Sequence, residues 1–296
     1  MHMRVGVAGL GLMGAGIATR LTRTDNTLFL YNRCRAKAER FSKIATIVSS
    51  PKELADKCDF IILVVTDFTA VLAILLGENG IVKTDNRNLI VADASTISPS
   101  QSEHCANTLR QTVGIDMLSM PVMGGPKAAE TGDLIPMVAG SKNAFEKTKQ
   151  VIEKLGRSFY IGEKHGAANA IKLALNINIA LIASAISEGM TLVKGYGIDP
   201  AEFIEILNST SFRTGLSERK GPKMVNGDFA PSFHLKNMLK DLDLATSVAQ
   251  TQGISLPQTA LAQQIYRAAN NSGFSDKDYT AICAFLAKIN GMEQQQ

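Results

Sequence analysis

The first half of the chain alternates short β-rich apolar runs with segments of helix-forming composition. Such runs are typical of buried strands, and their alternation with helices predicts a doubly wound α/β sheet that is parallel at its start. The predicted strands are Arg4–Ala8, Thr27–Tyr31, Phe60–Val65, Leu89–Asp93, Gly114–Leu118, Ile135–Ala139 and Phe159–Ile161, and the predicted helices between them include Met13–Arg23, Ala36–Phe41 and Asn143–Leu155.

After Gly162 the strand pattern stops and helical periodicity takes over. Pro200 and Pro257 stand at two of the predicted helix starts, where the fixed φ of proline suits the first helical position. The predicted helices are Ala167–Lys194, Pro200–Asn208, Leu235–Gln252, Pro257–Asn270 and Tyr279–Ile289. We therefore expect an N-terminal Rossmann-type domain, residues 1–163, followed by an all-α C-terminal domain, residues 164–296, joined by a long interdomain helix.

The long helix is apolar enough to raise the question of a membrane span. Its uncharged stretch from Leu173 to Ser187 is shorter than the roughly 20 residues that a spanning helix needs, and Asn176 and Asn178 interrupt it. We expect a core helix of a protein without membrane contact.

Composition and charge narrow the class of partner. The chain has 296 residues, 45% hydrophobic and 20% charged, with a formal net charge of +4. This mild excess suits an anionic small molecule and does not indicate nucleic acid. The four scattered cysteines and the absence of a signal-peptide pattern favour a cytoplasmic protein with reduced thiols, and no histidine has the spacing of a metal site.

A glycine fingerprint follows the first predicted strand. Gly9, Gly11 and Gly14 in Gly-Leu-Gly-Leu-Met-Gly open a predicted helix. Glycines at these positions allow a tight turn, close approach of the backbone to a pyrophosphate, and close packing of helix on strand. We expect the whole loop, including Leu10, Leu12 and Met13, to bind a dinucleotide.

The end of the second predicted strand bears on the choice of cofactor. An acidic residue near this place would bind the ribose of NAD, whereas an arginine accommodates the 2′-phosphate of NADP. The chain has Asn32 and Arg33 here and no carboxylate until Glu39. We therefore expect Asn32 and Arg33 to contact the ribose end of the cofactor, and NADPH to be preferred over NADH.

Two further strand ends and one loop are candidates for ligand contacts, because ligands lie beyond the carboxyl ends of parallel strands. Val65 and Thr66 follow one strand, and Thr96 follows another, where Ser95 or Thr96 could alternatively cap the next helix. Gly124 and Gly125 could expose backbone N–H groups to a carboxylate, or only form a turn.

Taken together, these segments resemble the β-hydroxyacid dehydrogenase family, which includes 3-hydroxyisobutyrate dehydrogenase and the glyoxylate/succinic semialdehyde reductases. The resemblance covers almost the whole chain and is nearest to the latter branch. It runs through Gly9–Gly14, Asp93–Thr96, Pro121–Gly125, Gly166–Asn176, Ser187–Gly189 and Phe233–Ala245.

The resemblance implies a role for several residues. Lys172 would be the catalytic acid/base, and Asn176, one helical turn later, would hold the substrate. Thr96 and Lys240 would contact the cofactor, and Phe233 and Asp241 would line the substrate site. The activity implied is NADP(H)-dependent interconversion of a small hydroxy acid and its semialdehyde or oxo acid.

One position departs from the family. Met123 stands before the paired glycines, where the family commonly has a serine whose hydroxyl binds the substrate carboxylate. A thioether cannot donate that hydrogen bond. The backbone donors of Gly124 and Gly125 remain, so we still expect an acid, whose identity is left open.

Three alternatives stay open at this point. A 6-phosphogluconate dehydrogenase relative would usually have a histidine where this chain has Leu175. An imine reductase would often lack the lysine, as would a non-catalytic NADP-binding module. Small residues on the long helix, such as Ala180 and Ala183, permit close helix packing and favour a homodimer or homotetramer.

Overall fold

The computed structural model describes residues 2–292, which divide into two compact units. The first unit runs through Lys172, and the second begins at Leu173. The division falls inside the long helix α8 (Gly166–Gly195), whereas the sequence analysis placed it before this helix.

The first unit is built on a sheet that has nine strands among the described residues, in the order β3-β2-β1-β4-β5-β6-β8-β7, with β9 paired to β8. Neighbours from β3 to β6 are parallel, and β8 runs antiparallel to β6 and β7. The strand order reverses between β1 and β4, which is where open sheets of this type bind ligands. The strands are β1 (Arg4–Ala8), β2 (Thr27–Tyr31), β3 (Thr46–Ile47), β4 (Phe60–Leu63), β5 (Ile90–Asp93), β6 (Asp116–Ser119), β7 (Val122–Met123), β8 (Ile135–Ala139) and β9 (Phe159–Gly162).

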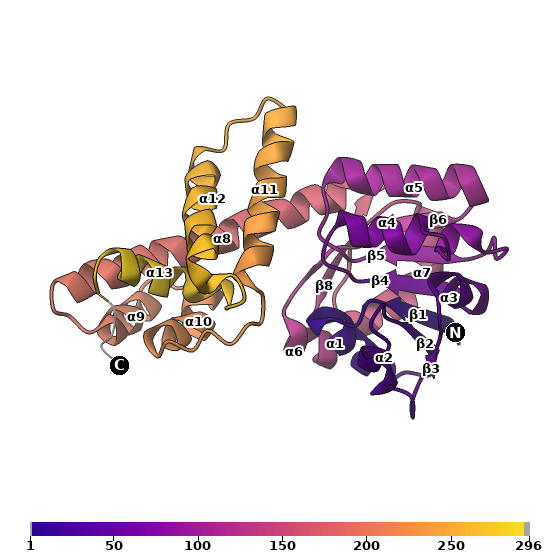
Figure 1. The fold of residues 1–296 in the computed structure, drawn as a ribbon, viewed down its shortest axis with the longest axis horizontal. Coiled ribbons are helices and arrows are strands. Elements are labelled where there is room, and N and C mark those ends of the chain that lie inside the picture. Colours follow the sequence, from indigo (N-terminus) through magenta and orange to yellow (C-terminus); the bar gives the residue numbers. More distant parts are fainter. Residues whose placement is uncertain (1, 293–296) are drawn as a thin grey trace. The chain divides into compact units, whose positions relative to one another are not determined.

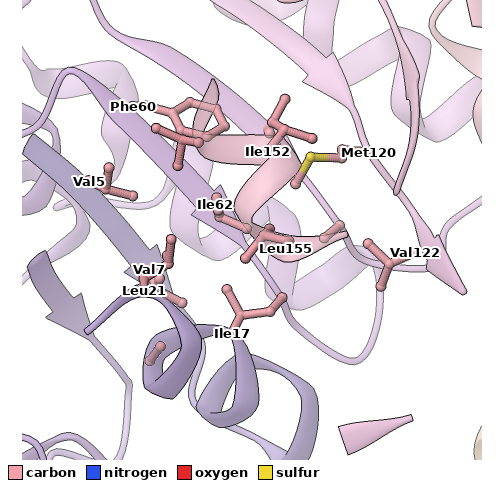
Figure 2. Packing of buried hydrophobic residues seen from close by; sticks show 14 of the residues in the cluster. Val5, Val7, Ile17, Leu21, Phe60, Ile62, Met120, Val122, Ile152 and Leu155 are labelled. Carbon is pink, nitrogen blue, oxygen red and sulfur yellow. The ribbon is translucent and has the colours of Figure 1, made fainter. Parts of the chain in front are cut away.

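Helices cover both faces of this sheet (Figure 1). Strand side chains alternate between two cores: Phe60 and Ile62 pack on one side, Ile61 and Leu63 on the other. Figure 2 shows the first core, where Ile17 of α1 and Ile152 of α7 meet β1 and β4. Helices α3, α4 and α5 pack on the second core. The helices of this unit are α1 (Leu12–Leu21), α2 (Ala36–Glu39), α3 (Pro51–Lys57), α4 (Phe68–Leu76), α5 (Pro99–Val113), α6 (Pro126–Thr131) and α7 (Lys142–Leu155), with the 3₁₀ turn η1 (Ile81–Lys83).

Among the strand boundaries that differ from the prediction, two have a visible reason. Gly114, expected to start a strand, adopts φ +71° and caps α5, so β6 begins at Asp116. The strand predicted to reach Val65 ends at Leu63, and Val65 N donates to the Ser95 side chain and not to a neighbouring strand.

The second unit is helical throughout its described residues, as expected. Ala180 and Ala183 of α8 pack with Leu235, Leu242 and Tyr266 in its main core. Pro222 lies inside α10, a helix that the sequence analysis did not predict. The elements that follow α8 are α9 (Pro200–Ser209), α10 (Gly215–Val225), α11 (Leu235–Thr251), α12 (Pro257–Ala269), η2 (Asn270–Phe274), η3 (Tyr279–Ala281) and α13 (Ile282–Ile289).

Helix α8 is, among the described helices, long and apolar enough to cross a membrane by length and composition alone, with a mean hydropathy of 1.7. About one third (33%) of that window is buried within the protein. The expectation of a core helix therefore describes one face of α8, while side chains such as Leu192, 72% exposed, lie outside the core.

Candidate active site

The glycine loop between β1 and α1 has the form that an anion site requires. Gly9 adopts φ +98°, and a Cβ there would overlap the carbonyl oxygen of Val64; a Cβ on Gly14 would overlap Gly9. Gly11, by contrast, has open space on its Cβ side and begins α1 without a side-chain cap. The first N–H groups of α1 are thus left for a ligand, which fits the pyrophosphate of a dinucleotide.

Asn32 shapes this loop. Its Oδ1 accepts a hydrogen bond from Leu10 N at 2.8 Å, and its Nδ2 donates to Cys34 O at 2.8 Å. The side chain predicted to touch the cofactor is therefore engaged with the backbone on both sides. Arg33 beside it is exposed, and Arg35 forms an ion pair with Glu39 at 2.7 Å.

The loops after β4 and β5 are joined to each other. Val65 N donates to Ser95 Oγ at 3.0 Å, which brings Val65 and Thr96 onto neighbouring strand ends. The alternative that Ser95 or Thr96 caps α5 is wrong, because Ser98 forms that cap in a capping box with Gln101.

Lys172 meets the predicted substrate loop within the first unit. Its Nζ donates to the Sδ of Met123 at 3.1 Å, at the end of β7. Gly124 follows with φ +125°, and Gly125 begins α6 without a side-chain cap; both are exposed. The structure thus brings the predicted acid/base and the predicted carboxylate loop together.

Four other predicted residues lie in the second unit. Asn176, on the turn of α8 after Lys172, is buried and donates from Nδ2 to Asp241 Oδ2 at 2.5 Å. Lys240 forms an ion pair with the other oxygen of Asp241 at 2.7 Å, and Asp241 is 1% exposed. Since its nitrogen is held by a carboxylate, the Asn176 amide presents its oxygen as an acceptor.

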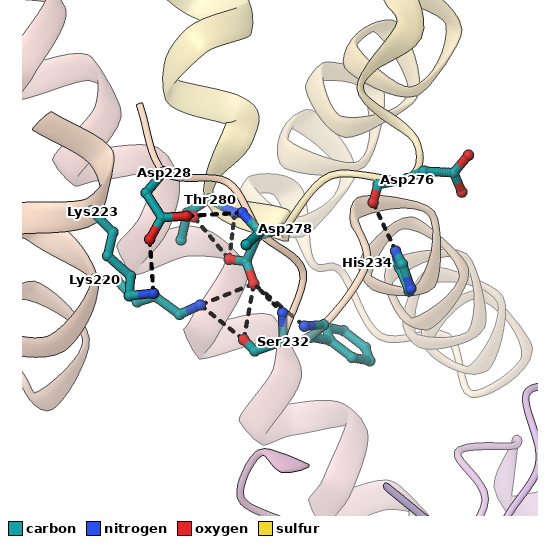
Figure 3. Close-up of polar contacts among 10 residues, drawn as sticks. Lys220, Lys223, Asp228, Ser232, His234, Asp276, Asp278 and Thr280 are labelled. Carbon is teal, nitrogen blue, oxygen red and sulfur yellow. Dashed lines mark hydrogen bonds and ion pairs between the residues drawn. The ribbon is translucent and has the colours of Figure 1, made fainter. Parts of the chain in front are cut away.

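Phe233 is held by Asp278, a buried carboxylate that the sequence pattern did not reveal. Figure 3 shows the contacts of Asp278 with Lys220 and Ser232. Asp278 Oδ2 accepts from Lys220 Nζ at 2.9 Å, from Ser232 N at 2.9 Å and from Phe233 N at 3.3 Å. The Phe233 ring also packs edge-on against Tyr279. Burial raises the pKa of Asp278, but these donors outweigh it and hold the pKa below its usual value.

No cluster of three or more His, Cys, Asp or Glu residues that could hold a metal ion occurs within residues 2–292. Two cavities, of about 560 and 420 Å³, are lined by none of the predicted site residues. The candidate site in the first unit is therefore the set of strand-end loops together with Lys172.

Comparison with known proteins identifies both halves of the chain. The family model for the NAD binding domain of 6-phosphogluconate dehydrogenase matches residues 4–162. The model for the NAD-binding domain of NADP-dependent 3-hydroxyisobutyrate dehydrogenase matches residues 166–286.

Individual relatives agree with these matches over nearly the full chain. The chain is 30% identical to 2-hydroxy-3-oxopropionate reductase of Escherichia coli, covering 96% of this chain and 97% of that protein. It is 29% identical to the chloroplastic glyoxylate/succinic semialdehyde reductase 2 of Arabidopsis thaliana, covering 98% and 81%. The solved structure of 3-hydroxyisobutyrate dehydrogenase from Salmonella typhimurium superposes with a TM-score of 0.85 at 24% identity, covering 96% and 99%, so it shares the fold. The chain therefore belongs to the β-hydroxyacid dehydrogenase family and is an enzyme of the NAD(P)-dependent dehydrogenase type.

Proposed function

We propose that this enzyme reduces a small semialdehyde or oxo acid to the hydroxy acid with NADPH, and that Lys172 is its acid/base. The observation that carries the proposal is the contact between the Lys172 amine and Met123, directly before Gly124 and Gly125. An ammonium group and the exposed Gly124–Gly125 loop meet in the NAD-binding unit, where a substrate carbonyl and its carboxylate need them.

Bound NADPH supplies the hydride that the carbonyl carbon receives. Lys172 donates a proton to the carbonyl oxygen as negative charge develops there, so that a hydroxyl group results. The N–H groups of Gly124 and Gly125 bind the substrate carboxylate. The Asn176 oxygen, oriented by Asp241, accepts from the hydroxyl group of the hydroxy acid that forms.

Met123 bears on the substrate class. A thioether is a weak acceptor and no donor, so it contributes no hydrogen bond to a carboxylate. Met123 also packs against an apolar cluster formed by Met137, Ala139 and Ala168. We infer an acid whose carboxylate is held by backbone groups and whose chain tolerates an apolar neighbour.

The preference for NADPH rests on Arg33. It is exposed at the end of β2, and none of the ion pairs found among residues 2–292 uses it, whereas Arg35 is paired with Glu39. A guanidinium is well suited to a phosphate. The family description of the second half as NADP-dependent agrees with this inference.

We also infer a cytoplasmic homodimer or homotetramer. The second unit exposes several large apolar side chains, including Leu192, Phe212 at 78% and Tyr196 at 86%. Surfaces of this kind favour association. Light scattering at micromolar concentration would distinguish the oligomer from a monomer.

The test of the proposal is NADPH consumption at 340 nm with glyoxylate, succinic semialdehyde, tartronate semialdehyde and methylmalonate semialdehyde. Lys172→Met should keep NADPH binding and lose about 10²–10⁴ in kcat, which is the contribution typical of a positioned acid/base. Lys194→Met, on the same helix with its amine bound to Met292 O, is the control and should leave kcat unchanged. Full activity of Lys172→Met, or no turnover of any of the four substrates, would contradict the proposal.

A further inference from the structure

The loop after β5 forms hydrogen bonds with the segments that follow the neighbouring strands β4 and β6. Ser95 N donates to Asp93 Oδ1 at 2.9 Å, and Ser95 Oγ accepts from Val65 N at 3.0 Å. Met120 N, on the way to the substrate loop, donates to Asp93 O at 2.7 Å. Asp93 and Ser95 are 1% and 2% exposed. The ends of β4, β5 and β6 are therefore fixed to one another by buried hydrogen bonds.

The same loop is also fixed to the start of α8. Asn169 Nδ2 donates to Ile97 O at 3.3 Å, and Asn169 is 1% exposed. Gly166, at the first position of the helix, lies so close to Pro99 and Glu103 that a Cβ there would overlap them. The first turn of α8 is thus tightly packed on the segment that follows Thr96.

The Asn169 side chain lowers the stability of the fold at this position. Its Oδ1 is buried without a hydrogen-bond partner among residues 2–292. An unsatisfied buried acceptor costs about 1–3 kcal/mol. An apolar side chain of similar size would avoid that cost, but it would also lose the hydrogen bond from the amide nitrogen to Ile97 O.

The hydrogen bond from Asn169 to Ile97 links the turn that carries Lys172 to the loop that carries Thr96. Asn169 lies three residues before Lys172, on the adjacent turn and the same side of α8. Ile97 directly follows Thr96, which is predicted to contact the cofactor. A displacement of about 1 Å between reacting groups can lower the rate about 10²-fold.

We propose that Asn169 is a positioning residue, whose bond to Ile97 O holds the turn that carries Lys172 in register with the Thr96 loop. Ser95 and Asp93 extend this brace to the loop of Val65. The proposal rests on the proposed role of Lys172 as acid/base.

The test compares Asn169→Ala and Asn169→Asp with Asn178→Ala, a matched control on the same helix whose Nδ2 donates only within the helix, to Ala174 O, and whose side chain is exposed. Affinity for NADPH is measured by the fluorescence of NADPH, and kcat, KM and the pH profile with the best substrate of the four. Asn169→Ala should lower kcat about 10- to 100-fold and leave the Kd of NADPH within about twofold. Asn178→Ala should match the parent enzyme.

Asn169→Asp removes the donor and keeps the shape of the side chain, and a lowered kcat with an unchanged Kd of NADPH is the result that a purely structural role would not give. The carboxylate has the shape of the amide but cannot donate to Ile97, and it stands one turn from the Lys172 ammonium. It should therefore shift the alkaline limb of kcat to higher pH as well as lower kcat. If Asn169→Ala does not fold, this isosteric variant carries the test alone.

The outcomes separate the two proposals. Normal kcat in Asn169→Ala or in Asn169→Asp, while Lys172→Met is inactive, would overturn the brace and leave the proposed function intact. An active Lys172→Met would overturn the proposed function itself.

Discussion

Replacing Lys220 by methionine should destabilise the second unit far more than the same change at Lys223. Both lysines lie on α10 and both bind an aspartate, Lys220 with Asp278 at 2.9 Å and Lys223 with Asp228 at 3.0 Å (Figure 3). The first pair is buried, with side chains 18% and 1% exposed, and the second is open, at 49% and 46%. The two ion pairs have similar lengths and differ in burial, and Lys220 also donates to Ser232 Oγ at 2.8 Å.

The expected loss of stability follows from the Asp278 carboxylate that remains buried after Lys220 is removed. At 2.9 Å the attraction in the buried pair is about 6 kcal/mol at an effective dielectric constant of about 20. Desolvation of both ions offsets most of it, so the pair itself contributes little net stability. Removing only Lys220 leaves the Asp278 carboxylate buried without its cation, which typically costs about 3–5 kcal/mol. The exposed Lys223 pair leaves no such buried charge.

Urea unfolding measures this difference in stability. Unfolding is followed by circular dichroism and by tyrosine fluorescence, since the chain has no tryptophan. With a slope of about 2 kcal/mol per molar urea, the midpoint of Lys220→Met should fall by about 2 M. Lys223→Met should stay near the parent midpoint. Equal midpoints for the two variants would refute the argument from burial.

The pH dependence gives an independent check. In the parent protein the pKa of Asp278 is lowered, so its contribution is complete above the unfolded pKa of about 3.9 and is lost as pH falls through the folded value. Without Lys220, burial still raises the pKa of Asp278, and the hydrogen bond and positive charge that lower this pKa are lost. Protonation then relieves the buried charge, and the deficit of Lys220→Met should shrink between pH 7 and pH 4.

Three further predictions concern the ligand sites. Gly11→Ala should leave the melting temperature unchanged, because its Cβ meets open space, but should weaken NADPH binding at least tenfold. Gly9→Ala should lower both the melting temperature and the affinity for NADPH. A normal NADPH affinity for Gly11→Ala in fluorescence titration would contradict the placement of the pyrophosphate. Arg33→Ala should weaken NADPH about tenfold and spare NADH, whereas an equal loss for both would show that Arg33 does not read the 2′-phosphate. Met123→Ser should lower the KM for the best acid substrate about tenfold by adding a donor, with Met123→Leu as the control that adds none; identical KM values would exclude a role in carboxylate binding.

Much of the first unit could be predicted because its signals are local. The strands Arg4–Ala8, Thr27–Tyr31 and Ile135–Ala139 match β1, β2 and β8 to the residue. The two-residue strands β3 and β7 were not predicted, since so short a segment is defined by its partner rather than by its own pattern. Helix α10 was missed because Gly221 and Pro222 normally argue against a helix interior.

The candidate site divides in the same way. The glycine loop, Lys172 and the Gly124–Gly125 pair occur in contiguous motifs, so the sequence displays them. Ser95, Asn169 and Asp278 act through partners 30, 72 and up to 58 residues away, and no local pattern reveals such pairs. Asn32 shows the converse: its position after β2 suggests a ribose contact, but the fold uses both ends of its amide to shape the loop.

The order of the two units along the chain has a consequence for biosynthesis. Every parallel pair in the first sheet needs a crossover connection, so its contacts are distant in sequence and it should fold slowly, whereas helices close local contacts quickly. The slow unit is translated first. At about 5–20 residues per second, the ribosome takes on the order of ten seconds to make the helical unit. During that time the sheet can form while most of the helices that follow α8 have yet to be synthesised.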